Sequence, residues 1–157
     1  MITIASAKNS DYEDFLDIFG IVEEQHRLAL PRKYTKPDIL FTQEEYQHLI
    51  KQKKHQIFMA KSGEESVGIL LAEIKYAPNK PTLKKRMYVD IDTICIRPEW
   101  RGRGIGKMLL ETIEIWTKEK GVHDIQLNVW SFNQEALEFY EKNEYIIVSS
   151  LMRKHLS

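Results

Sequence analysis

Hydrophobic spacing in the N-terminal third of the chain predicts one strand followed by two helices. Residues 2–7 read as a strand, and residues 12–29 read as a helix because apolar side chains recur there at helical spacing. Thr42 and Glu45 form a capping box for a second helix, which should end near residue 53. No motif in this third of the chain indicates a function.

The remaining two thirds alternate between strand and helix patterns. The predicted strands cover residues 56–61, 67–76, 87–97, 124–129 and 145–151, with a hairpin turn at residues 62–63. The predicted helices cover residues 105–120 and about 131–142, the second opening on a box-like pair, Ser131 and Gln134. The order is β-α-α-β-β-β-α-β-α-β. Its central strand–helix–strand unit implies one parallel crossover in a mostly antiparallel sheet, so the fold class is α+β with a mixed sheet.

Composition indicates a single domain, residues 1–157, and argues against several kinds of partner. Apolar residues make up 43% of the 157, enough for a full core. The net charge is zero, whereas a nucleic-acid-binding protein would usually carry a basic excess. No apolar run approaches the length that spans a membrane. The single cysteine, Cys95, cannot form an internal disulfide, and with no signal-like N-terminus the expected location is the cytoplasm.

The glycine-rich stretch 101–107, Arg-Gly-Arg-Gly-Ile-Gly-Lys, predicts a phosphate-binding turn. It lies between a predicted strand and a predicted helix. Uncovered N–H groups and the positive end of the helix dipole attract phosphate there, and glycine lets a ligand approach the backbone closely. Arg101, Arg103 and Lys107 add positive charge.

Two common nucleotide-binding patterns do not fit this stretch. The Walker P-loop needs G-x-x-x-x-G-K-[ST], but Arg101 replaces the first glycine and Met108 replaces the hydroxyl that would hold magnesium. Gly102, Gly104 and Gly106 give G-x-G-x-G, not the dinucleotide pattern G-x-G-x-x-G. The pattern that fits is R-x-x-G-x-G. It resembles the coenzyme A pyrophosphate loop of the GNAT superfamily of N-acetyltransferases.

A second motif supports the resemblance, which extends over more than a third of the chain. Asn133, Ala136 and Tyr140 have the N-x-x-A-x-x-x-Y spacing of the family's fourth helix. The family usually continues Y-E-K-x-G-F, whereas here Glu144 stands at the glycine position. We expect Asn143 to adopt the left-handed, helix-ending conformation in its place.

The resemblance implies a GNAT-like twisted sheet of about six to seven strands flanked by about four helices. Its fourth and fifth strands would separate to admit the pantetheine arm. It also implies acetyl-CoA as cosubstrate and no metal. Backbone N–H groups of residues 94–96 would polarise the thioester carbonyl, residues 101–107 would hold the pyrophosphate, and Lys84, Lys85 or Arg103 would meet the ribose 3′-phosphate. The implied cofactor-binding residues are Ile94, Cys95, Ile96, Arg101, Gly102, Arg103, Gly104, Ile105, Gly106, Lys107, Asn133 and Tyr140.

Acetyl transfer from a thioester to an amine needs a base for the ammonium and an acid for the leaving thiolate. Tyr140 is the candidate general acid, and the alternative is a core tyrosine on an amphipathic helix. For the base, Asp90 and Asp92 are expected on one face of the strand 87–97, together with Ile94 and Ile96. Asp92 is the stronger candidate, acting directly or through a water. The alternative is a charged pair with neighbouring basic residues.

The expected function is therefore acetylation of a primary amine by direct attack in a ternary complex. The expected partner is a small-molecule amine, such as a polyamine, an amino-acid-like amine or an aminoglycoside. A homodimer is possible, and neither nucleic acid nor membrane is expected as a partner. Two alternatives stay open: a protein acetyltransferase acting on an N-terminus or a lysine, and an acyl-CoA-binding module without turnover.

Overall fold

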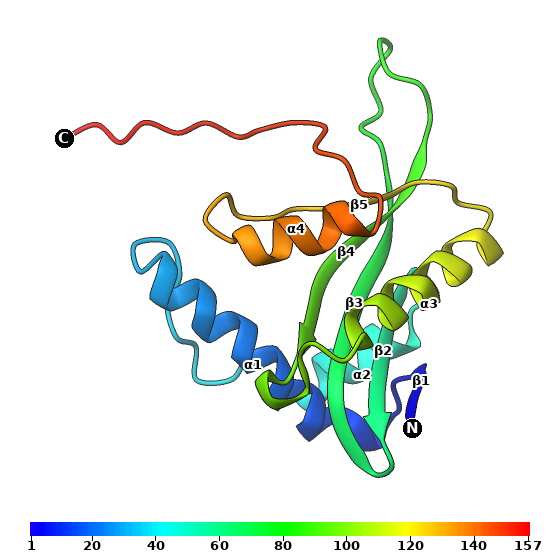
Figure 1. The fold of residues 1–157 in the computed structure, drawn as a ribbon. Coiled ribbons are helices and arrows are strands. Elements are labelled where there is room, and N and C mark those ends of the chain that lie inside the picture. The colour runs from blue at the N-terminus through cyan, green and yellow to red at the C-terminus, as the bar shows by residue number, and fades with distance from the viewer. The chain divides into compact units, whose positions relative to one another are not determined.

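The structure is a computed structural model that describes residues 1–157, and its centre is a five-stranded mixed sheet. The strands lie in sequence order: β1 (Ile2–Ser6), β2 (His55–Ser62), β3 (Glu65–Tyr76), β4 (Met87–Ile96) and β5 (Ile125–Leu127). The helices are α1 (Tyr12–Ala29), α2 (Gln43–Lys51), α3 (Ile105–Glu119) and α4 (Gln134–Lys142) (Figure 1). Strands β1 to β4 pair antiparallel, and β5 pairs parallel with β4 through the α3 crossover. The predicted fold class and parallel crossover are confirmed.

The chain forms two compact units, Met1–Leu127 and Asn128–Ser157. The first contains the sheet with α1, α2 and α3, and the second contains α4 and the extended segment after it. That the two make up a single domain stays a prediction. None of the helices combines the length and the apolar character needed to cross a lipid bilayer.

Helices α1 and α2 cover one face of the sheet, and α3 lies across the other (Figure 1). The capping box predicted for α2 is present, since the Glu45 N–H donates to Thr42 Oγ1 and the Thr42 N–H donates to Glu45 Oε1, both at 3.1 Å. The buried Tyr46 hydroxyl donates to the Lys8 carbonyl at 2.7 Å, so its polar atom is satisfied inside the core. The core on this face consists of Phe15, Ile18, Phe19, Tyr46, Ile57, Met59, Ile69, Leu71 and Cys95.

Strand β4 contains a bulge at Asp92, which the prediction of a regular strand did not include. Thr93 pairs with Leu71 and Ile91 pairs with Ala72, so Asp92 has no partner on β3. One extra residue reverses which side chains face which side beyond it. The prediction of one shared face is therefore wrong: Asp90 lies on the face of Thr93 and Cys95, and Ile94 and Ile96 lie on the opposite face.

The strand predicted for residues 145–151 is absent, so the sheet has five strands and not six to seven. The segment is extended but has no ladder partner, and Ile146, Val148 and Leu151 are 81%, 78% and 93% exposed. The run has the β-branched composition of a strand. That composition measures how well side chains fit a packed sheet, and the second unit contains no strand for this segment to pair with.

Helix α4 ends at Lys142 as predicted, but the residues at its two caps differ from those predicted. Asn133, not Ser131, caps its start, with Oδ1 accepting from the Ala136 N–H at 3.1 Å. At its end Glu144 adopts the left-handed conformation with φ of 69°, while Asn143 has φ of −99°. The expectation for Asn143 is therefore wrong, and the glutamate takes the glycine conformation itself.

Replacing Glu144 by glycine is expected to stabilise the chain by up to about 1 kcal/mol. The left-handed conformation costs an L-residue about 1–2 kcal/mol, part of which is offset by the larger unfolded-state entropy of glycine. Glu141→Gly is the control, because Glu141 is an exposed residue inside α4, and it should lose about 1 kcal/mol. Urea unfolding of both variants gives the comparison, and a loss of stability in Glu144→Gly would contradict the expectation.

Candidate cofactor and catalytic site

As predicted, residues 101–107 lie between β4 and α3 and open the helix: residues 101–104 form the turn, and residues 105–107 begin α3. A short 3₁₀ turn, Pro98–Trp100, leads into them. Gly102 and Gly104 have φ of 76° and 81°, a region that glycine adopts without strain. The first intrahelical bond of α3 runs from the Met108 N–H to the Gly104 oxygen at 3.1 Å. The N–H groups of residues 105–107 precede that bond, so the helix offers them to a ligand.

The loop fits a phosphate group. A Cβ atom added at Gly102 or Gly104 would meet no heavy atom within 4 Å, so a ligand can reach the backbone there. Helix N–H donors and the positive end of the α3 dipole favour an anion at this point. Lys107 makes only a long contact of 3.9 Å with Glu111, and both side chains are exposed, so its ammonium group can turn to a ligand. These residues suit the pyrophosphate of coenzyme A.

Arg101 and Arg103 turn back onto the loop and brace it. Arg101 Nε donates to the Ile96 carbonyl at 3.1 Å. Arg103 Nη2 donates to the Glu99 carbonyl at 3.2 Å, and its guanidinium lies 4.4 Å from the centre of the Trp100 ring. Arg101 and Arg103 therefore have a structural role in the loop besides their positive charge, and the sequence did not show that role.

Beyond Ile91, strand β4 has no partner on its β5 side, because the ladder between the two strands ends at that residue. Strand β5 itself ends at Leu127, so the predicted separation of the fourth and fifth strands stays a prediction. The backbone N–H of Arg97 points to β3, where it donates to the Val67 carbonyl at 2.9 Å. Since N–H groups alternate between the two edges of a strand, those of Ile94 and Ile96 point to the open side. Two backbone donors are available there for a thioester carbonyl.

Neither the side chain nor the backbone N–H of Cys95 points to the β5 side of β4. Its side chain is 5% exposed in the core with α1 and α2, and by the same alternation its N–H faces β3. Burial raises the pKa of the Cys95 thiol to about 11, so the thiol is protonated at neutral pH. This geometry supports a packing role for Cys95 and gives no support to its predicted contact with the cofactor.

Alkylation of Cys95 by iodoacetamide at pH 8 is expected to be more than about a hundredfold slower than that of an exposed cysteine. A pKa of about 11 leaves that much less thiolate, and burial slows access further. Mass spectrometry over time measures the rate, and urea-unfolded protein provides the fast reference. Native and unfolded protein reacting at the same rate would contradict the expectation.

The two candidate bases have different surroundings. The Asp90 carboxylate pairs with the Lys75 ammonium at 2.7 Å, and its side chain is 16% exposed. Asp92 is exposed and accepts a hydrogen bond from the Thr93 hydroxyl at 3.0 Å. Asp90 is thus held in a structural ion pair, while Asp92 at the bulge is exposed to solvent. Asp92 as the general base stays a prediction.

Lys84 and Lys85 lie at the opposite end of β4 from the glycine loop. They precede Met87, where the strand begins, whereas the loop follows Ile96. A strand of 10 residues spans roughly 30 Å. The 3′-phosphate belongs to the same nucleotide as the pyrophosphate, so the predicted contact with Lys84 or Lys85 is wrong and Arg103 remains the candidate.

Tyr140 and Asn133 lie in the second unit. The Tyr140 ring packs edge-on against Phe139 and Tyr145, with centroid distances of 5.2 and 5.7 Å. Burial, and then the neighbouring Tyr145, raises the pKa of the Tyr140 phenol above its usual range, so the phenol keeps its proton at neutral pH. The Asn133 side chain caps α4. Their cofactor contacts, and Tyr140 as general acid, stay predictions.

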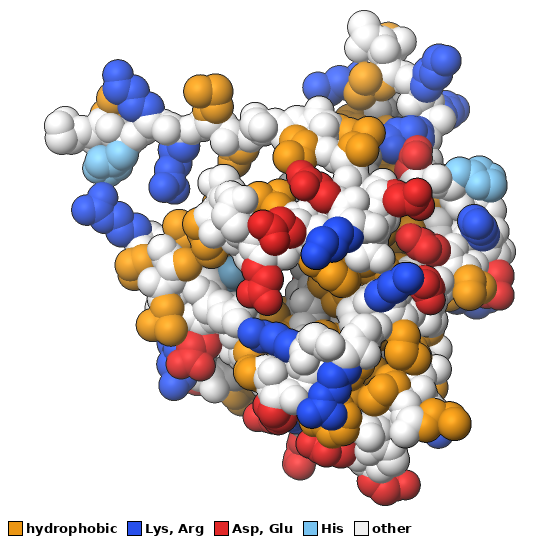
Figure 2. Space-filling model, in the orientation of Figure 1, with side chains coloured by type: hydrophobic (Ala, Val, Ile, Leu, Met, Phe, Trp, Pro, Cys, Tyr) orange, Lys and Arg blue, Asp and Glu red, His pale blue; other side chains and the backbone are white.

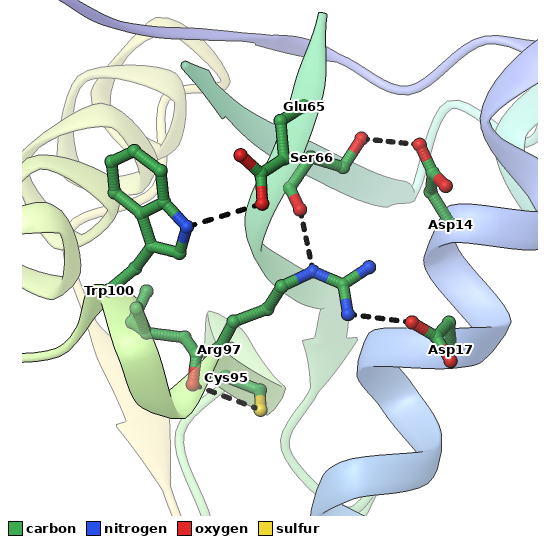
Figure 3. A network of polar contacts seen from close by, with 8 residues as sticks. Asp14, Asp17, Glu65, Ser66, Cys95, Arg97 and Trp100 are labelled. Carbon is green, nitrogen blue, oxygen red and sulfur yellow. Dashed lines mark hydrogen bonds and ion pairs between the residues drawn. The ribbon is translucent and has the colours of Figure 1, made fainter.

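Sequence reasoning missed the residues that hold the loop to the rest of the first unit. Arg97 Nη1 donates to Asp17 Oδ2 at 2.6 Å, and Arg97 Nε donates to the Ser66 carbonyl at 2.7 Å (Figure 3). The Ser66 hydroxyl donates to Asp14 at 2.7 Å. The one available signal was the spacing of Asp11, Asp14 and Asp17, which puts three carboxylates on one flank of α1.

Comparison with known proteins shows which family the chain resembles. The profile of the family described as "Acetyltransferase (GNAT) family" matches residues 16–145. The protein MJ1207 of Methanocaldococcus jannaschii, described as an uncharacterized N-acetyltransferase, is 26% identical over 140 residues, which are 89% of this chain and 58% of that protein. The chain thus spans less than two thirds of that relative's length.

Two further similarities extend over most of this chain and most of the protein with which it is compared. Thialysine N-epsilon-acetyltransferase of Caenorhabditis elegans is 26% identical over 121 residues, which are 77% of this chain and 72% of that enzyme. The crystal structure of a mutant of the BH1408 protein from Bacillus halodurans superposes with a TM-score of 0.92 at 24% identity, covering 99% of each chain. This last similarity supports the fold.

Proposed function

Because the chain belongs to the acetyltransferase (GNAT) family, we propose that it transfers the acetyl group of acetyl-CoA to the primary amine of a small molecule. The observation that carries the proposal is the turn after β4. Its left-handed glycines leave the backbone open at the start of α3, and the adjoining stretch of β4 has an open edge. The exposed backbone at the start of α3 suits a pyrophosphate, and the adjoining stretch of β4 suits a thioester carbonyl.

The reaction needs three events. An ammonium with a pKa of about 10.4 must lose its proton, for which Asp92 or a water beside it is the acceptor. The amine nitrogen then attacks the thioester carbon, and the N–H groups of Ile94 and Ile96 hold the developing oxyanion. The C–S bond breaks as the nitrogen loses its second proton to solvent, and the thiolate takes a proton from the Tyr140 phenol, which regains one from solvent. The products are an acetamide and free coenzyme A.

An amino-acid-like amine is the first acceptor to test. The C. elegans relative is a thialysine acetyltransferase by name, and it aligns with 77% of this chain. Polyamines and aminoglycosides follow as broader amine classes. Figure 2 shows acidic and basic side chains intermingled on the face it draws, which accords with the net charge of zero. The described residues include no group of three or more His, Cys, Asp or Glu that could hold a metal.

A panel of amines tests the proposal, with acetyl-CoA as donor and free thiol as readout. Thialysine, lysine, a polyamine, an aminoglycoside and a lysine-containing peptide represent the acceptor classes. We expect turnover on at least one small amine and a mass gain of one acetyl group on the product. Preference for the peptide would favour a protein acetyltransferase. Acetyl-CoA binding without thiol release on any amine would favour a binding module, and tighter binding of ADP or NAD than of coenzyme A would overturn the cofactor assignment.

A further inference from the structure

We propose that Arg97 is a positioning residue that couples the acetyl-CoA loop to helix α1. The inference rests on the proposed use of residues 101–107 for acetyl-CoA. Arg97 follows the last residue of β4 and precedes the turn Pro98–Trp100, so it stands at the base of that loop.

The Arg97 guanidinium joins two elements that are distant in sequence. Its Nε donates to the Ser66 carbonyl at 2.7 Å and its Nη1 donates to Asp17 at 2.6 Å, while its own N–H donates to the Val67 carbonyl at 2.9 Å. The side chain is only 19% exposed. In Figure 3 the planar group bridges the start of β3 and the flank of α1. A fork of donors in one plane fixes orientation as well as distance.

Contacts beside Arg97 hold the same junction. The Ser66 hydroxyl, which is 2% exposed, donates to Asp14 on α1 at 2.7 Å. The Trp100 indole N–H reaches Glu65 at 3.4 Å, which ties the 3₁₀ turn to the first residue of β3 (Figure 3). The base of the loop is thus attached to α1 and β3 at one point.

The weak contribution of this ion pair to stability favours a positioning role. Asp17 is 67% exposed, and an ion pair so open to water contributes little to the free energy of unfolding. The contact is nevertheless short and well directed. If the loop depends on α1 for its position, a ligand on the loop must stabilise the contact with α1 in return.

A matched ion pair at the N-cap of the same helix provides the control. Lys61 on β2 binds Asp11 at 2.6 Å, with side-chain exposures of 34% and 6%. It joins the sheet to the residue that caps the start of α1, from β2 and with a better buried carboxylate than that of Asp17. Lys61→Gln should therefore lower thermal stability at least as much as Arg97→Gln, without moving the loop.

The test is acetyl-CoA binding measured by calorimetry on full-length variants. Arg97→Gln and Asp17→Asn should each raise the Kd by about fivefold or more, and Lys61→Gln should leave it within about twofold. Arg97→Lys keeps the charge but cannot bridge both acceptors, so it should behave as Arg97→Gln. Asp17→Asn keeps the shape of an exposed side chain, so it provides an answer even if an Arg97 variant does not fold.

Hydrogen exchange supplies a second readout, which a merely structural role would not change. Acetyl-CoA should slow amide exchange in residues 12–18 of the wild-type protein but not in Arg97→Gln. Equal Kd values for Arg97→Gln and Lys61→Gln, or equal slowing in both proteins, would overturn the inference and leave the proposed function intact. A wild-type protein that does not bind acetyl-CoA would overturn the proposed function, and the inference with it.

Discussion

Gly104→Ala is expected to weaken acetyl-CoA binding by about tenfold or more, which corresponds to a loss of at least about 1.4 kcal/mol. Gly104 has φ of 81° and caps α3, so its substitution strains the turn that displays the helix N–H groups. The added methyl group would also enter the open space over the backbone, where the pyrophosphate is expected to lie. Calorimetric titration gives the Kd, and the KM for acetyl-CoA should rise in parallel.

Gly63→Ala separates backbone strain from ligand contact. Gly63 has φ of 61°, and a Cβ there would likewise meet nothing within 4 Å, but it lies in the turn between β2 and β3. Both variants should lose a similar free energy of unfolding, about 1–2 kcal/mol. Only the Gly104 variant should lose affinity. Equal Kd values for the two would mean that the loop backbone does not contact the cofactor.

The fold was predictable where one segment carries its own signal. The Thr42 and Glu45 pair marked the start of α2, and helical spacing marked α1 and α3. Prediction failed where the outcome depends on a neighbour. Residues 145–151 have strand composition but no ladder partner, and Glu144 adopts a conformation that its side chain disfavours. Strand propensity is a property of the segment alone, whereas strand pairing depends on the presence of a neighbouring strand.

The candidate site shows the same limit on a finer scale. The glycine loop was recognisable because its chemistry lies in consecutive residues. The arrangement of β4 was not predicted, although residues 89–96, VDIDTICI, carry a sign of it. The apolar positions 89 and 91 change phase to 94 and 96, and the pairing with β3 shows that change as a bulge at Asp92. The bulge separates Asp92 from the ion-paired Asp90. It also turns the N–H groups of Ile94 and Ile96 to the side where β5 has ended.

The bulge also explains why the two aspartates cannot be exchanged in a mechanism. The Asp90 carboxylate is 16% exposed and paired with Lys75, so it is not free to take a proton from a substrate. Asp92 has only the Thr93 hydroxyl as a partner, so its carboxylate keeps lone pairs for a water or an amine. A single residue inserted in one strand thus separates a structural carboxylate from a candidate catalytic one.

Tyr140→Phe is expected to lower kcat by about a hundredfold or more, the range for loss of a general acid. The KM for acetyl-CoA should change by less than about threefold, because the ring and its packing against Phe139 and Tyr145 remain. The pKa of the Tyr140 phenol is raised, so the acid form persists as the pH increases. The wild-type kcat should therefore show no alkaline decline due to Tyr140 below about pH 10, the usual phenol pKa.

Tyr145→Phe is the matched control, since it removes the same hydroxyl from the ring 5.7 Å away in the same unit. Steady-state kinetics with the best amine of the panel compare the two variants. A large loss of kcat in Tyr140→Phe alone supports proton donation by that phenol. Equal activity in both variants would remove Tyr140 from the chemistry, and the leaving thiolate would then have to take its proton from water. In that case the Asn133–Tyr140 spacing would mark only the packing of α4, which is the reading that its amphipathic sequence favours on its own.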